Sequence, residues 1–94
     1  MYYDTAETGQ RIKHLRKAEE LTQEQMAEQV GVSARQVRAF ESGQSGAAID
    51  VLIILAELFD TSLDYLVLGK PTQADIRKKL DAMLQDLSEI MKTL

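Results

Sequence analysis

The chain has 94 residues, of which 45% are hydrophobic and 28% charged, and its formal net charge is −4. This length fits one domain with an appended element rather than two independent cores, and the lack of cysteine excludes disulfides and thiolate metal sites. The first ten residues lack a secretory pattern and the longest apolar run, VLIILA, is too short to cross a bilayer, so we expect a cytoplasmic protein with no membrane partner.

Apolar residues recur along the chain at three- and four-residue spacing, which predicts an all-α fold. A first helix is expected at about 8–18, anchored by Ile12. A second helix begins after Thr22, because Thr22 and Gln25 have the spacing of a capping box. It ends at Gly31, since glycine readily adopts the left-handed conformation that closes a helix.

A third helix begins almost at once. Ser33 and Gln36 form another capping-box pattern, Val37 and Phe40 supply the apolar face, and Gly43 ends the helix. Only the residues GVS connect it to the preceding helix. A connection this short holds two helices at a steep angle, which is the geometry of a helix-turn-helix.

Three more helices follow. The fourth is expected at about 48–59, and Ser62 caps a short fifth one. Pro71 interrupts the pattern, and Thr72 begins a last helix at about 73–92. We therefore divide the chain into a helix-turn-helix domain, 1–69, and a C-terminal amphipathic helix, 70–94.

The outward face of the third helix carries the side chains suited to reading DNA. At about 100° per residue, Arg35 and Ala39 lie nearly opposite the core positions, with Arg38 beside them. Arginine can bond guanine through two hydrogen bonds, and alanine can contact a thymine methyl group in the major groove. The only carboxylate on this helix, Glu41, is near its end.

The acidic net charge argues against a nucleic-acid partner, but the charges are unevenly distributed. Six basic residues stand against four glutamates from 11 to 38, whereas 50–64 contains four acidic residues and no basic one. The net charge of the whole chain therefore does not describe the electrostatic potential around the helix-turn-helix.

Four segments together resemble the Cro/phage-repressor (XRE) type of helix-turn-helix domain: RIKHLR, LTQEQMAEQVGVS, VRAFESG and TSLDYLVLG. The resemblance covers about two-thirds of the chain. It implies a five-helix, lambda-repressor-like DNA-binding domain, used as a transcriptional regulator, usually a dimer on a palindromic operator in double-stranded DNA.

The resemblance also implies roles for individual residues. Arg16 and Glu41 correspond to a buried ion pair that braces the first helix against the third, and Gln23 corresponds to a phosphate ligand. Glu20 stands where many relatives have glycine, and the loop QSGAA lacks the basic residues that relatives often have. The positions that correspond to DNA contacts are Gln23, Ser33, Ala34, Arg35, Gln36, Arg38, Ala39 and Ser42.

The C-terminal helix carries an apolar seam with heptad spacing. We expect it to form a homodimer rather than to dock on its own domain, because the stripe is longer than a small domain needs. The fourth helix is apolar around most of its circumference, so the dimer seam is either the last helix alone or the last helix with the partner's fourth helix. The seam residues are Ile76, Leu80, Met83, Leu87, Ile90 and Leu94, and Leu84 and Met91 widen the apolar stripe beside them.

Other functions are less well supported by the sequence. It contains no catalytic Ser/His/Asp set, paired carboxylates in an apolar segment or glycine-rich phosphate loop, and its lone histidine, His14, is expected on the surface. We therefore expect neither an enzyme nor a cofactor or metal. The alternative is a protein-interaction module, such as an antitoxin, whose apolar helices hold a partner protein.

Overall fold

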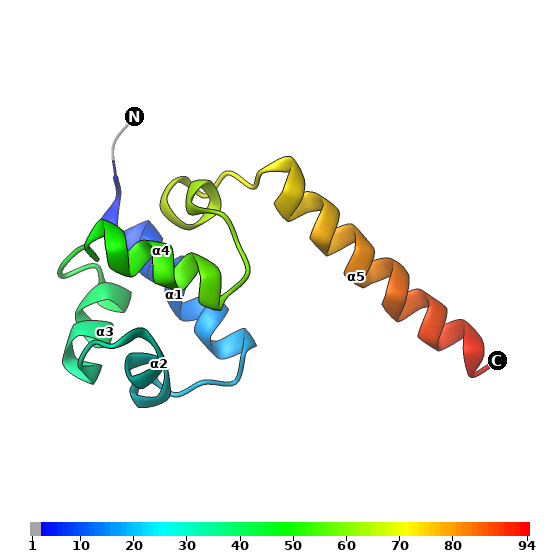
Figure 1. Cartoon of the computed structure of the whole chain (residues 1–94), viewed down its shortest axis with the longest axis horizontal. Helices are drawn as coiled ribbons and strands as arrows, with labels where there is room; N and C mark the ends of the chain where they lie inside the picture. The colour runs from blue at the N-terminus through cyan, green and yellow to red at the C-terminus, as the bar shows by residue number, and fades with distance from the viewer. Residues whose placement is uncertain (1–2) are drawn as a thin grey trace.

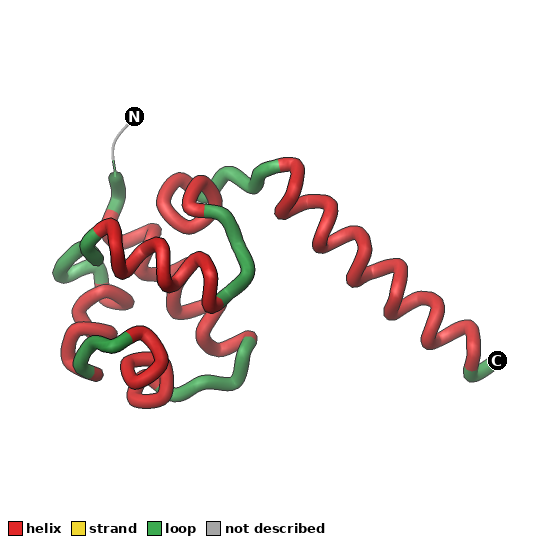
Figure 2. The backbone as a smooth tube through the Cα atoms, viewed as in Figure 1, coloured by secondary structure: helices red, strands yellow, loops and turns green. Residues whose placement is uncertain are grey.

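The computed structural model describes residues 3–94, and these form helices and connecting loops without any strand (Figure 2). The predicted all-α fold is confirmed. The helices are α1 (Thr5–Ala18), α2 (Gln23–Val30), α3 (Ala34–Ser42), α4 (Ile49–Leu58), η1 (Asp64–Leu68) and α5 (Gln73–Lys92).

Three helices begin with capping boxes, at Thr22 and Ser33 as the sequence predicts, and at Thr72, where the sequence predicts a helix start. At α2, the backbone N–H of Gln25 donates to the Thr22 hydroxyl at 3.0 Å, and the Thr22 N–H donates to the Gln25 side chain at 2.9 Å. The same reciprocal pair begins α3 at Ser33, and it begins α5 at Thr72. Each box satisfies two backbone donors that a helix end would otherwise leave unpaired.

The start of α1 was predicted wrongly, at residue 8 instead of Thr5. The Asp4 carboxylate accepts the N–H groups of Ala6 and Glu7 at 3.0 and 3.1 Å and so caps the helix earlier. Thr8 is inside the helix and fully buried, and its hydroxyl donates to the carbonyl of Val67 at 3.2 Å.

The core receives one fully buried side chain from each of the five helices of the domain. These side chains are Ile12, Met26, Val37, Leu55 and Leu66, each at most 1% exposed. In the view of Figure 1, α4 is in front of α1, and α2 and α3 lie together at one end of the domain. The hydrophobic core therefore holds the helix-turn-helix on a scaffold made by α1, α4 and η1.

Two contacts fix α1 within this scaffold. A Cβ atom at Gly9 would collide with the carbonyl oxygen of Phe40, so α1 and α3 approach each other with only a glycine between them. Arg11 donates from Nε and Nη2 to the carbonyls of Leu66 and Val67, both at 2.9 Å. A cation at these carbonyls complements the negative end of the short η1 helix, which is a π-helix.

The last helix, α5, projects away from the other helices (Figure 1). All its residues are exposed or half-buried, and the chain reaches 48 Å along its longest axis. Within residues 3–94, none of the helices combines the length and apolarity that crossing a bilayer requires.

Asp75 attaches the beginning of α5 to the domain. Its carboxylate accepts hydrogen bonds from the Thr72 N–H at 2.9 Å, from the Ser62 N–H at 3.1 Å and from the Ser62 hydroxyl. Partial burial raises the pKa of Asp75, but the hydrogen bonds from Ser62 and Thr72 outweigh this effect and hold the pKa below its usual value of 3.8. The same Ser62 hydroxyl accepts the Tyr65 N–H and so caps the start of the π-helical segment.

Candidate nucleic-acid interface

The turn between α2 and α3 is built around Gly31. This residue has a φ angle of +84°, which an L-residue with a side chain rarely adopts, and its N–H donates to the carbonyl of Ala27 at 2.9 Å. The Val32 N–H donates to the same carbonyl at 3.1 Å. Two residues later Ser33 begins α3, so the turn is short and hydrogen-bonded.

The face of α3 opposite the core bears the two arginines. Arg35 and Arg38 are exposed and Ala39 beside them is half-buried, whereas Ala34 at the edge of this face is half-buried because it packs against the core. The small side chains leave the helix backbone open to close approach, and the arginines extend beyond it. Arg38 keeps 55% of its side chain exposed, although its Nη1 is 3.9 Å from the carboxylate of Glu24 on α2. An exposed pair at that distance is weak.

Ser33 and Gln36 use part of their hydrogen-bonding capacity within the capping box. The Gln36 side-chain oxygen accepts the Ser33 N–H at 2.9 Å, and the Ser33 hydroxyl oxygen accepts the Gln36 N–H at 3.1 Å. The Gln36 amide nitrogen and the Ser33 hydroxyl hydrogen remain able to donate. The capping box occupies one of the two lone pairs of the Gln36 oxygen, and both hydrogens of its amide nitrogen can donate to a phosphate or a base acceptor.

A buried ion pair joins α1 to the end of α3. Arg16 donates from Nε and Nη2 to the two carboxylate oxygens of Glu41, at 2.6 and 3.1 Å. Both residues are less than 10% exposed. Arg16 also donates to the carbonyl of Leu21 at 2.7 Å, and so it fixes the loop before α2. The guanidinium of Arg16 therefore makes its hydrogen bonds inside the domain.

The amide of Gln23 belongs to the same cluster, a contact that the sequence did not reveal. Its Nε2 donates to Glu41 at 3.1 Å. An amide nitrogen has two hydrogens, so one remains for another acceptor beside the N-terminus of α2. Spacing along the sequence cannot show this contact, because Gln23 and Glu41 are 18 residues apart and meet only through the packing of α2 on α3.

Two of the six basic residues in the segment 11–38 are therefore structural. Arg11 binds the end of η1 and Arg16 binds Glu41, whereas Lys13 and Lys17 on α1 are exposed. At the other end of α3, the Ser42 hydroxyl is exposed and donates to the carbonyl of Ala39 at 3.2 Å.

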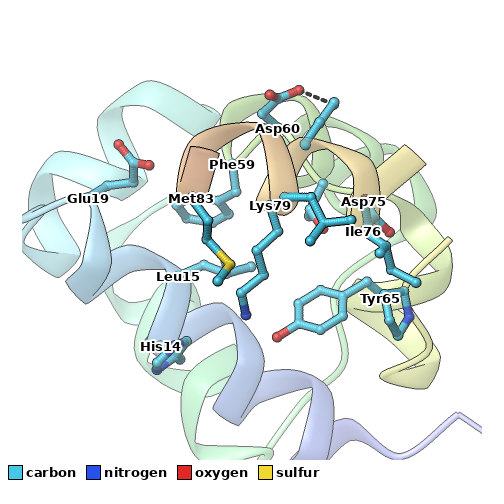
Figure 3. Close-up of a pocket in the computed structure, with 14 residues that line it drawn as sticks. His14, Leu15, Glu19, Phe59, Asp60, Tyr65, Asp75, Ile76, Lys79 and Met83 are labelled. Atoms are coloured by element: carbon cyan, nitrogen blue, oxygen red, sulfur yellow. Dashed lines mark hydrogen bonds and ion pairs between the residues drawn. The ribbon is translucent and has the colours of Figure 1, made fainter. Parts of the chain in front are cut away.

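A groove lies away from α3, between the domain and the beginning of α5 (Figure 3). This groove has a volume of about 610 Å³. Leu15 and Tyr65 form its domain side, and Ile76 and Met83 form its α5 side. At its edge Lys78 of α5 donates to Asp60 at 2.6 Å.

The seam residues on α5, and Leu84 and Met91 beside the seam, are all exposed in the single chain. Their exposed fractions range from 48% for Ile76 to 99% for Leu94. A contiguous apolar stripe of this kind is typical of an interaction surface. The members of the stripe are Ile76, Leu80, Met83, Leu84, Leu87, Ile90, Met91 and Leu94.

Comparison with known proteins places this geometry in a family. Residues 12–66 match the family model described as helix-turn-helix. The uncharacterised HTH-type transcriptional regulator YobD of Bacillus subtilis is 41% identical over 58 residues, which is 62% of this chain and 52% of that protein. The chain thus matches about half the length of this relative.

Solved structures show the same fold. The P22 c2 repressor, determined in complex with a synthetic operator, has a TM-score of 0.65 and 28% identity, and the alignment covers 67% of this chain and 96% of that one. A transcriptional regulator from Listeria innocua has a TM-score of 0.62 and 31% identity over 99% of this chain and 88% of that one.

Proposed function

The chain belongs to the Cro/phage-repressor type of helix-turn-helix transcriptional regulators, and from this premise we propose that it represses transcription by binding a palindromic operator as a homodimer. The observation that carries the proposal is the exposed arginine pair on α3, which stands on a capped helix held by a buried ion pair.

In the proposed complex α3 lies in the major groove. Arg35 donates two hydrogen bonds to a guanine, Arg38 reaches a second base or a flanking phosphate, and Ala34 and Ala39 allow the backbone to approach the base edges. The partially buried position of Ala39 is compatible with this role, because only its methyl group needs to touch the DNA.

Contacts to phosphates hold the domain in register. Gln23 donates its remaining amide hydrogen and its backbone N–H to one phosphate, where the field of the α2 N-terminus adds to the attraction. Ser33 and Gln36 donate from the beginning of α3. At its end, Ser42 donates to a phosphate once its hydroxyl hydrogen turns away from the carbonyl of Ala39. Because Arg11 and Arg16 are used within the domain, we expect few contacts per subunit and a modest dependence of affinity on salt.

The dimer forms through α5, and it doubles the number of contacts. A two-fold axis between the subunits would place the two α3 helices about 34 Å apart, one turn of DNA. The exposure of the whole apolar stripe on α5 supports this role. The segment 70–94 is accordingly the proposed dimerisation element, and 1–69 the DNA-binding domain.

A rival function is favoured by two observations, the net charge of −4 and the apolar stripe. The chain would then be an interaction module, for example an antitoxin that binds another protein. A gel shift with the DNA upstream of its own gene, at low and moderate salt, separates the two. A specific shift at low salt supports the regulator, and equal affinity for that DNA and for unrelated DNA contradicts it.

Base reading by Arg35 is tested by Arg35→Ala. We expect a loss of about 1–3 kcal/mol in binding free energy and a relaxed preference at one base pair, because one bidentate contact disappears. Binding to a set of operators with single base-pair changes measures both effects. Lys13→Ala removes an exposed cation from α1 and serves as the control. A loss that is equal for all sequences would contradict base reading.

A further inference from the structure

The outer face of α4 is apolar and uncovered. The helix buries Leu52 and Leu55, but Ile49 and Ile53 remain 64% and 43% exposed on the other side. These two residues are four apart, and Glu57 continues the same row. The helix therefore presents a row of two isoleucines ending in a carboxylate.

One edge of α5 has matching chemistry. Arg77, Leu84 and Met91 follow one another at seven-residue spacing, so they lie in one row along the helix. Leu84 and Met91 are 64% and 63% exposed. This row lies beside the heptad seam of α5. If two α5 helices paired through that seam alone, the row would remain largely in water, because a strict heptad seam is narrow.

We infer that α5 of a second copy packs this row on α4, reciprocally, so that the homodimer proposed above uses both helices. With a rise of about 1.5 Å per residue, Ile49 and Glu57 are roughly 12 Å apart, and Arg77 and Leu84 about 10.5 Å. An antiparallel alignment thus brings Arg77 of one copy to Glu57 of the other while Leu84 covers Ile49.

The charges around the two rows are complementary. The segment 50–64 contains four acidic residues and no basic one, whereas the first part of α5 contains Arg77, Lys78 and Lys79. Lys78 already binds Asp60, the second residue beyond the end of α4, within the same chain. The proposed contact between Arg77 of one copy and Glu57 of the other therefore joins a base of α5 to an acidic residue of 50–64, as the contact within the chain does.

The number of residues that a stable interface requires also supports a contact between α5 and the partner's α4. A stable interface of standard size uses about 20–30 residues of all kinds from each partner, and α5 has 20 residues, of which only those on the side of the apolar stripe can face a partner helix. Because α5 of the same chain leads away from α4, the helix that covers α4 comes from the second copy (Figure 1). Two-fold symmetry then repeats the contact and closes the dimer.

Charge reversal tests the contact. Glu57→Arg and Arg77→Glu should each weaken dimerisation about threefold or more, and the double variant should recover most of the loss, because the pair is restored with its polarity exchanged. Glu89→Arg, on the outer side of α5, is the control. Sedimentation equilibrium at low salt gives the dissociation constants. If the dissociation constant of the double variant rises by the product of the two single-variant effects, the pairing is contradicted.

Cross-linking gives an independent measurement, because the chain contains no cysteine. Ile53→Cys and Leu84→Cys chains are mixed, exchanged and treated with a short bismaleimide. A mixed product, identified by mass, is expected. Its absence while sedimentation still shows a dimer overturns the α4 contact and leaves the homodimer intact. Cross-linking of Ile53→Cys to itself alone would show α4 against α4 and overturn it too. A monomer at all concentrations overturns both proposals.

Discussion

Glu20 has a backbone conformation that suits glycine better. Its φ angle is +57°, and its N–H donates to the carbonyl of Lys17 at 3.0 Å to close α1. A residue with a Cβ atom is destabilised in this left-handed conformation. The resemblance to the Cro/phage-repressor type, which implies glycine at this position in many relatives, agrees with this strain.

Glu20→Gly should therefore stabilise the fold. Relief of the left-handed strain outweighs the larger entropy of glycine in the unfolded chain, and we expect the free energy of unfolding to rise by about 1 kcal/mol. Urea unfolding followed by circular dichroism measures it. Glu19→Gly, at a position with φ of −87°, is the matched control and should not stabilise. An equal gain at both positions would refute the role of the conformation.

Glu41 receives three hydrogen bonds from two side chains, those of Arg16 and Gln23. Glu41→Gln would leave the Arg16 cation buried without its counter-charge, which typically destabilises a fold by about 3–5 kcal/mol. Urea unfolding again provides the measurement. Glu28→Gln, an exposed change on α2, should have little effect. A loss below 1 kcal/mol for Glu41→Gln would mean that the pair contributes little to holding α1 on α3.

At the scale of helices, local sequence patterns predicted most boundaries correctly. The boxes at Thr22, Ser33 and Thr72 are short-range signals, because cap and backbone donors are three residues apart. The exposed arginine face of α3 follows from helical periodicity in the same way. The start of α1 was missed because the buried Thr8 has the residue type of a cap while Asp4 performs that function.

Features that depend on packing could not be predicted from spacing. Gln23 meets Glu41, and Asp75 meets Ser62, only because two helices come together in the folded chain. The π-helical form of η1 and the direction of α5 have the same origin. The sequence thus predicts which side chains α3 exposes, but not how the neighbouring polar groups divide their hydrogen bonds among themselves.

The attachment of α5 should depend on pH through Asp75. Its pKa is lower in the folded chain than in the unfolded chain, so the attachment is stabilised above the unfolded pKa and loses this stabilisation as the pH falls through the folded value. Asp75→Asn should therefore increase proteolysis in the segment 69–72 at pH 7. As the pH falls through the lowered pKa of Asp75, the wild-type carboxyl group becomes protonated and the difference should shrink.

Limited proteolysis near neutral pH, and an acid-stable protease such as pepsin at acidic pH, measure this prediction. Asp81→Asn changes an exposed carboxylate on the same helix and is the control. Equal cleavage of Asp75→Asn and wild type at pH 7 would show that the carboxylate does not hold α5.

Across the whole molecule, charge and apolar surface are separated. Exposed bases belong to α1 and α3 (Lys13, Lys17, Arg35 and Arg38) and to the first part of α5 (Arg77, Lys78 and Lys79), whereas the acidic residues of 50–64 belong to α4, η1 and the loop between them. The apolar stripe follows α5, away from α3 (Figure 1). The net charge of −4 therefore describes the average of two different surfaces, and a weakly basic reading face needs a second subunit for useful affinity.

The dependence of DNA binding on association is tested by Leu80→Asp with Leu87→Asp. Two carboxylates in the apolar seam should give a monomer in sedimentation experiments, because neither charge can be buried unpaired. Operator affinity should fall by about a hundredfold or more, since two linked contacts become one. Ala82→Asp with Gln85→Asp adds the same charge on the outer side of α5 and should remain dimeric. If the variant with Leu80→Asp and Leu87→Asp still sediments as a dimer, the interface lies away from the seam of α5. A monomer with unchanged operator affinity would instead show that one domain suffices for binding.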